Sequence, residues 1–404
     1  MLAARLRRIT AQLTPFGWVL IAVLALVCAF YLFKAATMFQ VDLAVYRDGV
    51  RAAWSRGDLY ELLFPPVGLP FTYPPFAALV FTPLAILPLT ATQILWCLIT
   101  LVCGLVYGVV CVRDYTAARF QSMTFTLIVL IALLVSDPLR IGILFGQINV
   151  VLAVLVILDL NGRSGRLPQG VLIGIAAAIK LIPLFLILYF IVTKRFKSAV
   201  IAAGTFVVAS AIAFACFPQA SAQYWGELVL DSTRVGGIAY ISNQSLQGML
   251  IRVMGGPDQA KLAWFVCASI LALAMLWVCW RLFATFPAIC NALILATMLM
   301  ASPVSWTHHW ILILPLLLVC LTPAIQWASL TLKVIAALLV VALMGGVIWF
   351  VPNTDDQEYH HNLWQFLVGN SYVWLTVLLM IALAVVGLRA RRAVAAAAAS
   401  ATAA

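Results

Sequence analysis

The run FGWVLIAVLALVCAFYLF, from Phe16 to Phe33, decides what kind of fold this chain adopts. It holds no charged side chain and nearly reaches the ~20 apolar residues that an α-helix needs to cross a bilayer. Comparable apolar runs recur along the chain, and none shows the alternating pattern of membrane barrel strands. The sequence therefore predicts an all-α membrane protein, built as a polytopic transmembrane helical bundle.

Composition supports this fold class. Hydrophobic residues make up 65% of the 404 positions and charged residues 9%, whereas about 25% of a soluble domain is charged. The net charge of +11 does not indicate a nucleic-acid partner, because the basic residues cluster beside the ends of apolar runs, as cytoplasmic anchors do. These residues are Arg5, Arg7, Arg8, Arg113, Arg119, Arg163, Arg166, Lys194, Arg195, Lys197, Arg281, Arg389, Arg391 and Arg392. The nine cysteines lie in apolar segments without CxxC spacing, which indicates packing residues.

The basic clusters predict a path through the membrane. Residues 1–15 are then cytoplasmic, and the first run is a retained span, since no small-residue cleavage site of a signal peptide follows it. Residues 34–90 form a first periplasmic loop, whose apolar part 76–89 is too short to cross and lies at the interface. A membrane domain over 16–390 has further spans at 91–111, 122–136, 143–160, 198–216, 262–285, 287–302, 310–322, 331–351 and 366–388.

The run 169–192 is expected to be broken. It carries Lys180 and Pro183 in its middle and has basic clusters at both ends, so a single crossing does not fit. Two short helices that meet near the midplane fit better, and such breaks occur where they line a cavity or pack on protein. With a long outer loop at 217–260 and a disordered Ala-rich tail at 391–404, the chain has ten or more membrane helices and no soluble domain.

This topology sorts the polar residues to one side of the membrane. Of the 13 acidic residues, only Asp114 and Asp159 fall inside, and all four histidines fall outside. The outer acids are Asp42, Asp48, Asp58, Glu61, Asp137, Glu227, Asp231, Asp258, Asp355, Asp356 and Glu358. Any chemistry of this chain is therefore expected to face the periplasm.

Asp42 is the first candidate catalytic residue, in the segment VDLAVY at 41–46 where the chain first emerges. It is either a surface acid at a helix start or a base beside an apolar boundary. A carboxylate in such a place has a raised pKa and can accept a proton from a sugar hydroxyl. The sequence leaves both interpretations open at this point.

Several polar side chains nearby are candidate ligands for sugar hydroxyls. Tyr46 follows Asp42, and Tyr73 lies in the aromatic and proline-rich elbow FTYPPF at 71–76, which is also explained as a rigid loop. Gln147 and Asn149 stand at the outer start of a span, where they serve either as helix caps or as sugar ligands.

Lys180 is a buried cation between apolar residues, in the sequence IKLIP at 179–183. Intramembrane charges are costly, so a functional role with an anion such as a lipid phosphate is the first interpretation, and a snorkelling lysine the second. Arg234, Asn243 and Gln244 are further polar candidates in the long outer loop. The glycosylation sequon at Asn243 is a weak three-residue match, and we discount it.

The run SPVSWTHHW at 302–310 is the most distinctive one. His308 and His309 are suited to bind a phosphate, transfer protons or bind a metal. Adjacent residues of a helix point about 100° apart, so both rarely ligate one ion, and no metal is expected. Interfacial anchoring explains Trp306 but not the histidines.

Six of these segments, in this order, resemble one family. They are VDLAVY at 41–46, FTYPPF at 71–76, GQINV at 146–150, KLIP at 180–183, RVG at 234–236 with NQS at 243–245, and SPVSWTHHW at 302–310. Over residues 16–390 the chain resembles the actinobacterial polyprenol-phosphate-mannose-dependent α-1,2-mannosyltransferases of glycosyltransferase family 87. Within that family the resemblance is to the mycobacterial enzymes of phosphatidylinositol mannoside assembly. The absent N-terminal extension of some relatives, and Leu246-Gln247 in place of an aromatic stretch, are departures.

The resemblance implies the GT-C fold, a polyprenyl-phosphate-mannose donor and a glycolipid acceptor at the plasma membrane. It implies an essential aspartate, which maps to Asp42, and an essential histidine, which maps to His308 or His309. Because the ionised phosphate leaves in a single inverting displacement, Asp42 is expected as the base, and Lys180, Arg234 and His309 as donor phosphate ligands.

Sugars are expected at Tyr46, Tyr73, Gln147, Asn149, Asn243, Gln244 and Trp306. No cofactor or metal is expected. The alternatives are a related transferase for another polyprenyl-phosphate sugar such as arabinose, and a lipid-linked sugar transporter. A transporter predicts a pathway with polar residues on both membrane sides, and the inner side of this chain holds two acids and no histidine.

Overall fold

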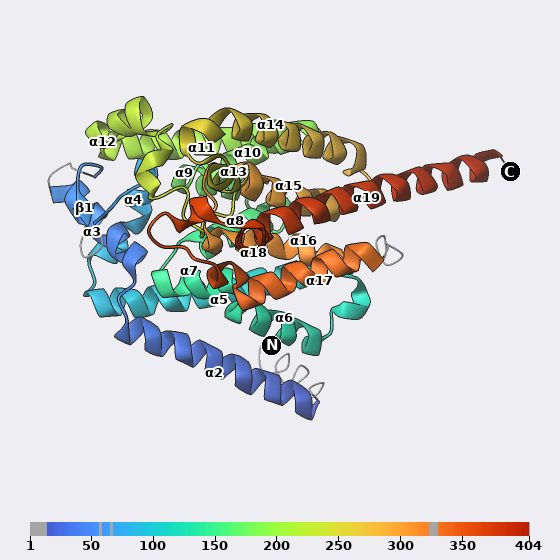
Figure 1. Ribbon diagram of the computed structural model, residues 1–404, viewed down its shortest axis with the longest axis horizontal. Coiled ribbons are helices and arrows are strands. Elements are labelled where there is room, and N and C mark those ends of the chain that lie inside the picture. The colour runs from blue at the N-terminus through green and yellow to red at the C-terminus, as the bar shows by residue number, and fades with distance from the viewer. Residues whose placement is uncertain (1–13, 56–58, 65–67, 323–329, 404) are drawn as a thin grey trace.

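The computed structural model describes residues 14–403 apart from 56–58, 65–67 and 323–329. Within this part the chain is almost entirely helical, and its only strands are β1 (Leu63–Phe64) and β2 (Leu69–Pro70), which pair antiparallel. The expected all-α fold class is thereby confirmed (Figure 1).

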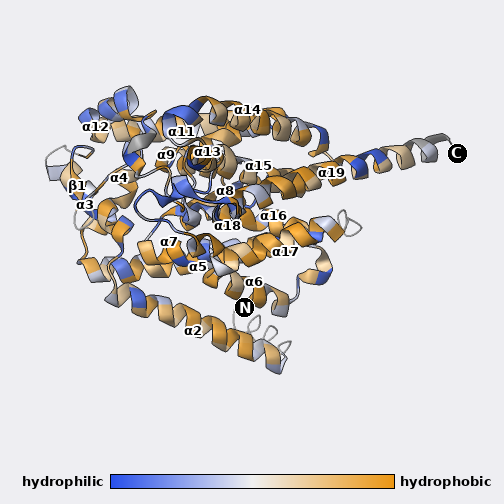
Figure 2. Cartoon of the chain, viewed as in Figure 1, coloured by the Kyte–Doolittle hydropathy of each residue, from blue (hydrophilic) through white to orange (hydrophobic). Residues whose placement is uncertain are grey.

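Five helices are long and apolar enough to cross a membrane. They are α2 (Pro15–Thr37), α5 (Leu89–Tyr115), α11 (Phe196–Cys216), α14 (Pro257–Leu282) and α19 (Ser371–Ala403). Large apolar side chains such as Phe33, Val200 and Leu262 are exposed on them, which suits a surface that faces lipid (Figure 2). The chain is a multi-pass membrane protein. Length and composition identify five spans among the described residues, or six with the bent pair described below, and not the ten or more expected.

Shorter apolar helices pack inside this frame. They are α4 (Pro75–Phe81) with η1 (Thr82–Ala85), α8 (Asn149–Leu160), α9 (Val171–Ile179), α10 (Phe185–Val192), α15 (Pro287–Ala301), α16 (Leu314–Val319) and α17 (Leu330–Gly345). Every residue of α15 from Ile289 to Met300 is buried, so this helix lies at the centre of the core. The remaining short elements are α3 (Val41–Ser55), η2 (Ala118–Phe120), α12 (Pro218–Gln223), the π-helix η4 (Tyr224–Leu228), η5 (Ser232–Val235), α13 (Leu246–Met254), η6 (Thr307–Ile313), η8 (Val347–Phe350), η9 (Gln357–His360) and α18 (Leu363–Gly369).

The expected break in the run 169–192 is confirmed. Helix α9 ends at Ile179, and Lys180 has the extended backbone angles φ −150 and ψ 123. The chain resumes in the 3₁₀ helix η3 (Ile182–Leu184), which contains Pro183, and continues as α10. Proline lacks the N–H that a continuous helix would need, so the break follows from the sequence.

The segment after the third expected span differs from the prediction. A span over 143–160 was expected, but α6 (Met123–Val135) is followed by a separate helix, α7 (Asp137–Phe145), at an angle of 57°. Pro138 in the first turn of α7 suits a helix start. Gly146 then has φ +74, and a Cβ there would lie 2.6 Å from the Cβ of Leu43. Glycine is therefore required where this turn contacts α3.

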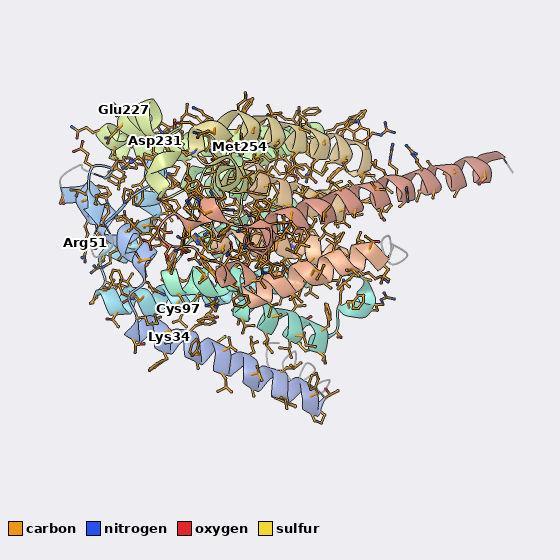
Figure 3. The ribbon with its side chains drawn as sticks, viewed as in Figure 1. Lys34, Arg51, Cys97, Glu227, Asp231 and Met254 are labelled. Carbon is orange, nitrogen blue, oxygen red and sulfur yellow. The ribbon has the colours of Figure 1, made fainter. Side chains whose placement is uncertain are left out.

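Different elements lie at the two ends of the bundle. In Figure 1 the start of α2 and the C-terminus lie at the right, while α3, β1 and α12 gather at the left. Arg51 and Glu227, at this left end, are labelled in Figure 3.

The Ala-rich tail continues α19 as a helix to Ala403, in contrast to the disorder expected. Alanine has the highest helix propensity. The cluster of Arg5, Arg7 and Arg8, like Asp58, lies outside the described residues.

Candidate active site

The link between the first span and α3 places Asp42. Helix α2 ends at Thr37 and α3 begins at Val41, so Asp42 lies in the first turn of α3, where a negative charge is favoured. Gln40 holds this link by donating from Nε2 to the carbonyl oxygen of Ile143 at 2.8 Å. The start of α3 is thereby fixed against the end of α7.

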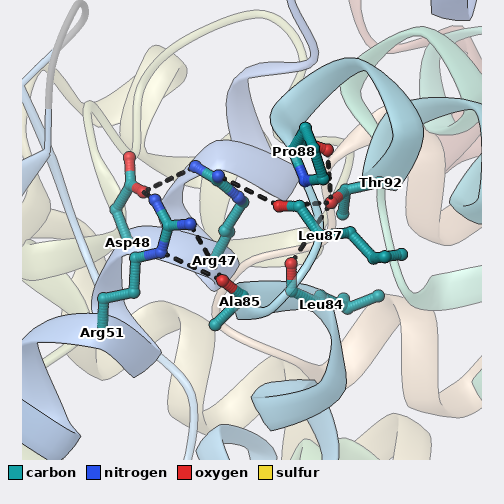
Figure 4. A network of polar contacts seen from close by, with 8 residues as sticks. All are labelled: Arg47, Asp48, Arg51, Leu84, Ala85, Leu87, Pro88 and Thr92. Carbon is teal, nitrogen blue, oxygen red and sulfur yellow. Dashed lines mark hydrogen bonds and ion pairs between the residues drawn. The ribbon is translucent and has the colours of Figure 1, made fainter.

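Two arginines fix α3 from its other side (Figure 4). Arg47 donates to the carbonyl oxygen of Leu87 at 3.1 Å, and Arg51 donates to that of Ala85 at 2.9 Å and 3.2 Å. Asp48 pairs with both guanidinium groups, at 3.4 Å and 3.8 Å. These residues therefore hold the helix that carries Asp42 and do not enter the site themselves.

The carboxyl group of Asp42 is buried, and its pKa is raised. Burial raises its pKa from the ordinary value to about 6, although a hydrogen bond with Gln147 and the charge of Lys180 act to lower it. Its Oδ2 atom is buried and has no hydrogen-bond partner among the described residues. A base with a pKa near the operating pH is effective in general-base catalysis.

Four of the predicted sugar ligands meet at one oxygen atom. The hydroxyl oxygens of Tyr46 and Tyr73 lie 2.9 Å apart, and 3.0 Å and 3.2 Å from Oε1 of Gln147. Asn149 donates from Nδ2 to the same Oε1 at 3.2 Å. The two tyrosine hydroxyl groups supply only two hydrogens for the three contacts among the tyrosines and Gln147. Oxygen lone pairs of the cluster therefore remain free to accept a hydrogen bond from a hydroxyl group of a ligand.

Lys180 extends this cluster toward the histidines. Its Nζ donates to Oδ1 of Asn149 at 2.9 Å, lies 2.8 Å from Nε2 of His309 and stands 5.3 Å above the ring of Tyr73. As an ammonium group it only donates, so Nε2 of His309 is the acceptor and its proton sits on Nδ1. No carboxylate forms an ion pair with Lys180 in the part of the chain that the structure describes. The amine is therefore a buried cation that lacks an anion.

The two histidines offer further groups to such an anion. His308 and His309 lie on η6 with ring centroids 4.8 Å apart, and each is 6% exposed. Both ring nitrogens of His308 and Nδ1 of His309 are buried without a partner among the described residues. Buried polar atoms are nearly always hydrogen-bonded, so three such atoms beside an unpaired cation indicate a place for a ligand.

An apolar groove adjoins this polar centre. Its cavity volume is about 30 Å³, and Asn149, Lys180 and His309 line one part of it. The rest is lined by the apolar residues Leu152, Ala153, Val156, Ile182, Pro183, Met298, Leu299 and Leu312. The site thus joins a cation to a hydrocarbon surface, which is the pattern that a lipid phosphate requires.

Asn243 and Gln244 lie next to the site as braces. Asn243 forms a β-bridge with Trp306, and its Oδ1 accepts from the backbone N–H of Ser305 at 3.0 Å. Gln244 donates from Nε2 to the carbonyl oxygens of Ile241 and Gly369 at 2.7 Å and 2.6 Å. Asn243 thereby braces the segment before the histidines, whereas Gln244 links its own turn to the end of α18 and keeps a buried Oε1 without a partner among the described residues.

Arg234 and Trp306 are not brought into the cluster around Gln147 and Lys180. Arg234 donates to the carbonyl oxygen of Tyr60, and its guanidinium group stands 5.7 Å above the Tyr60 ring. Tyr60 in turn donates to the carbonyl oxygen of Tyr73 at 2.7 Å. Trp306 is partly exposed, 6.5 Å from the ring of Tyr240. Arg234 therefore supports the elbow that carries Tyr73.

Two supporting residues were not predicted from the sequence. Tyr60, in the first outer loop, links Arg234 to Tyr73. Arg252, which is 4% exposed, donates to Oδ1 of Asn370 and to the carbonyl oxygen of Asn243 at 3.0 Å. The sequence signal that could have identified Arg252 is that it is a lone arginine in the apolar helix α13.

The fold and the site together define a multi-pass membrane enzyme whose polar centre opens onto an apolar groove. A family model described as glycosyltransferase family 87 matches residues 71–303, and the chain belongs to this family. The matched segment contains Tyr73, Gln147, Asn149 and Lys180. Asp42 and the histidine pair lie outside it.

Curated relatives agree with this assignment and confirm the resemblance. A polyprenol-phosphate-mannose-dependent α-(1-2)-phosphatidylinositol mannoside mannosyltransferase of Mycobacterium tuberculosis is 32% identical over 362 residues, covering 84% of this chain and 83% of the relative. One of the same description from Mycolicibacterium smegmatis is 33% identical, covering 83% and 81%. A phosphatidylinositol pentamannoside mannosyltransferase of Mycolicibacterium smegmatis is 32% identical, covering 78% and 76%. No solved structure matches the chain.

Proposed function

We propose that this protein transfers mannose from a polyprenyl-phosphate-mannose donor to a phosphatidylinositol mannoside acceptor, forming an α-1,2 linkage with inversion. The descriptions of the relatives support the donor and acceptor classes. The observation that carries the proposal is the position of Lys180, an unpaired cation between the polar cluster of Gln147 and the apolar groove.

The donor fits the site by its chemistry. Its phosphate is bound by Lys180 and by His309, which lies 2.8 Å from Lys180 and also lines the groove. Charge-assisted hydrogen bonds of this kind are stronger than neutral ones, which suits a group that becomes more negative as the sugar leaves. The first isoprene units run along the apolar residues that line this groove, such as Leu152 and Met298. Arg234 contributes by supporting Tyr73 and not by touching the phosphate.

Asp42 is the general base. Its carboxylate takes the proton of the acceptor hydroxyl while the hydroxyl oxygen bonds to the anomeric carbon and the bond from that carbon to the phosphate oxygen breaks. The electron pair goes to the phosphate, which is already ionised, so no general acid is needed. A β-linked donor then gives an α-linked product in one displacement. Tyr46, Tyr73, Gln147 and Asn149 hold the mannose near Asp42.

The direction of the site follows from topology. Helix α3, which carries Asp42, and α12 lie at one end of the bundle, opposite the C-terminus (Figure 1). We place that end at the periplasmic face of the plasma membrane, because the basic clusters favour the other end as cytoplasmic. Together with the shorter apolar helices, the spans then form a GT-C bundle of ten or more membrane helices.

The test is a transfer assay with purified protein in lipid nanodiscs. Polyprenyl-phosphate-mannose and a phosphatidylinositol mannoside should give an acceptor heavier by one hexose, sensitive to an α-1,2-specific mannosidase. The Asp42→Asn variant should give none above background. Product from a polyprenyl-phosphate-arabinose donor in place of the mannose donor would contradict the assignment. Movement of the donor across a vesicle bilayer without transfer would identify a transporter instead.

A further inference from the structure

A second cavity lies on the outer face, and the proposed mechanism does not use it. It has a volume of about 380 Å³ and lies between the loop 236–240, which follows η5, and the segment 353–359, which precedes α18. Its lining includes the aromatic residues Tyr240 and Tyr359 and the acids Asp355, Asp356 and Glu358. The volume falls within the range of small-molecule sites, about 300–1,000 Å³.

The cavity is next to the active site. The ring of Tyr240, which lines it, is 6.5 Å from the ring of Trp306. Trp306 directly precedes η6, which carries the histidines, and forms the β-bridge with Asn243. Tyr240 therefore connects the wall of the cavity to the residue that directly precedes the segment with His308 and His309.

The walls of the cavity are firmly held. Glu358 is 4% exposed and accepts from the backbone N–H of Ile241 at 3.3 Å. Arg252 donates to the carbonyl oxygens of Ala239 and Tyr240, at 3.1 Å and 3.2 Å. These bonds fix the loop on one wall and the acidic segment on the other, so the cavity is pre-formed.

The chemistry of the lining selects a neutral polyol. Carboxylates accept hydrogen bonds from neighbouring hydroxyl groups, and aromatic rings pack against the apolar C–H face of a sugar. Asp355, Asp356 and Glu358 repel phosphate, so an inositol phosphate or the donor phosphate does not belong here. Among the described residues, no group of three His, Cys, Asp or Glu side chains is arranged to hold a metal ion.

We infer that this cavity binds the mannose units that lie behind the reacting sugar of the acceptor. The inference rests on the proposed function, because it assumes that the acceptor presents its terminal hydroxyl to Asp42. The acceptor glycan then passes Trp306 and Tyr240 and enters the acidic cavity, while its phosphoinositol end stays outside. The cavity sets the length of glycan that the enzyme accepts.

The test compares two acceptors that differ only in the mannose units behind the reacting one. For the longer acceptor, the double variant with Asp355→Asn and Asp356→Asn should raise KM about tenfold, since neutral hydrogen bonds replace charge-assisted ones. The Tyr240→Ala variant should act in the same direction. For the acceptor without those units, and for the donor, KM should stay at the wild-type value. Glu227→Gln, which changes an exposed acid elsewhere on the outer face, is the matched control (Figure 3).

Equal KM values of wild type and the double variant for the longer acceptor would overturn the inference, as would an equal rise for both acceptors. A free α-linked mannotriose gives a second readout that needs no transfer. Saturation-transfer NMR should show its binding to the wild type and its loss in the double variant. Absence of product with every acceptor would reject the proposed function, and it would leave the mannotriose measurement to decide on the cavity.

Discussion

Replacing Lys180 by methionine tests the assignment of the donor phosphate most directly. The amine contacts Asn149 at 2.9 Å and His309 at 2.8 Å, and it has no anionic partner of its own among the described residues. A hydrogen bond to a charged group contributes about 1.5–3 kcal/mol. Its loss should therefore weaken donor affinity roughly 10- to 150-fold, since ~1.4 kcal/mol corresponds to a factor of ten.

The assay separates binding from folding. Donor KM and the binding of polyprenyl phosphate are measured on Lys180→Met in nanodiscs, together with thermal unfolding. Unfolding should occur at the wild-type temperature or above it, because a buried cation without an anionic partner destabilises the folded protein. Lys261→Met, at an exposed position near the start of α14, is the control. Unchanged donor KM, or lost activity explained by a lower unfolding temperature, would refute the reasoning.

Three further predictions follow from the site. Asp42→Asn should lower kcat by about 10²–10⁴-fold while donor binding is retained. In the wild type, kcat/KM for the donor should fall as the pH drops through about 6, because the carboxyl group must be ionised to act as a base. A rate that does not depend on pH would contradict this role. His309→Ala should raise donor KM more than His308→Ala, since only His309 contacts Lys180, and the reverse order in steady-state kinetics would exchange their roles. Gly146→Ala should cost about 1–3 kcal/mol of stability and lower kcat, because the new Cβ would lie 2.6 Å from that of Leu43, as thermal unfolding and turnover would show.

The sequence predicted the features that depend on local chemistry. A charged residue and a proline within one apolar run predicted the break at Lys180, and the structure has it there. The one-sided distribution of acids and histidines predicted that Asp42 and His309 belong to one end of the molecule. Lys180 lies between Tyr73 and His309 in the structure.

Other features depend on packing that no local pattern records. Gln147 and Asn243 are both amides in polar segments. Only the fold shows that Gln147 accepts hydrogen bonds from tyrosine hydroxyls, whereas Asn243 accepts one from a backbone N–H. Helix α7 was missed because the chain was expected to turn between spans at 122–136 and 143–160, and Pro138 is compatible with a loop as well as with a helix start.

The contacts at Lys180 also explain how a base and a leaving group act together. During transfer, Asp42 loses a negative charge as it takes a proton, and the phosphate gains one as the sugar departs. The net charge of the site stays constant, but negative charge moves from Asp42 to the phosphate, beside Lys180 and His309. In the empty site the charge of Lys180 lowers the pKa of Asp42 against the effect of burial. A bound phosphate offsets that charge, so donor binding raises the basicity of Asp42 at the moment when an acceptor proton has to be removed.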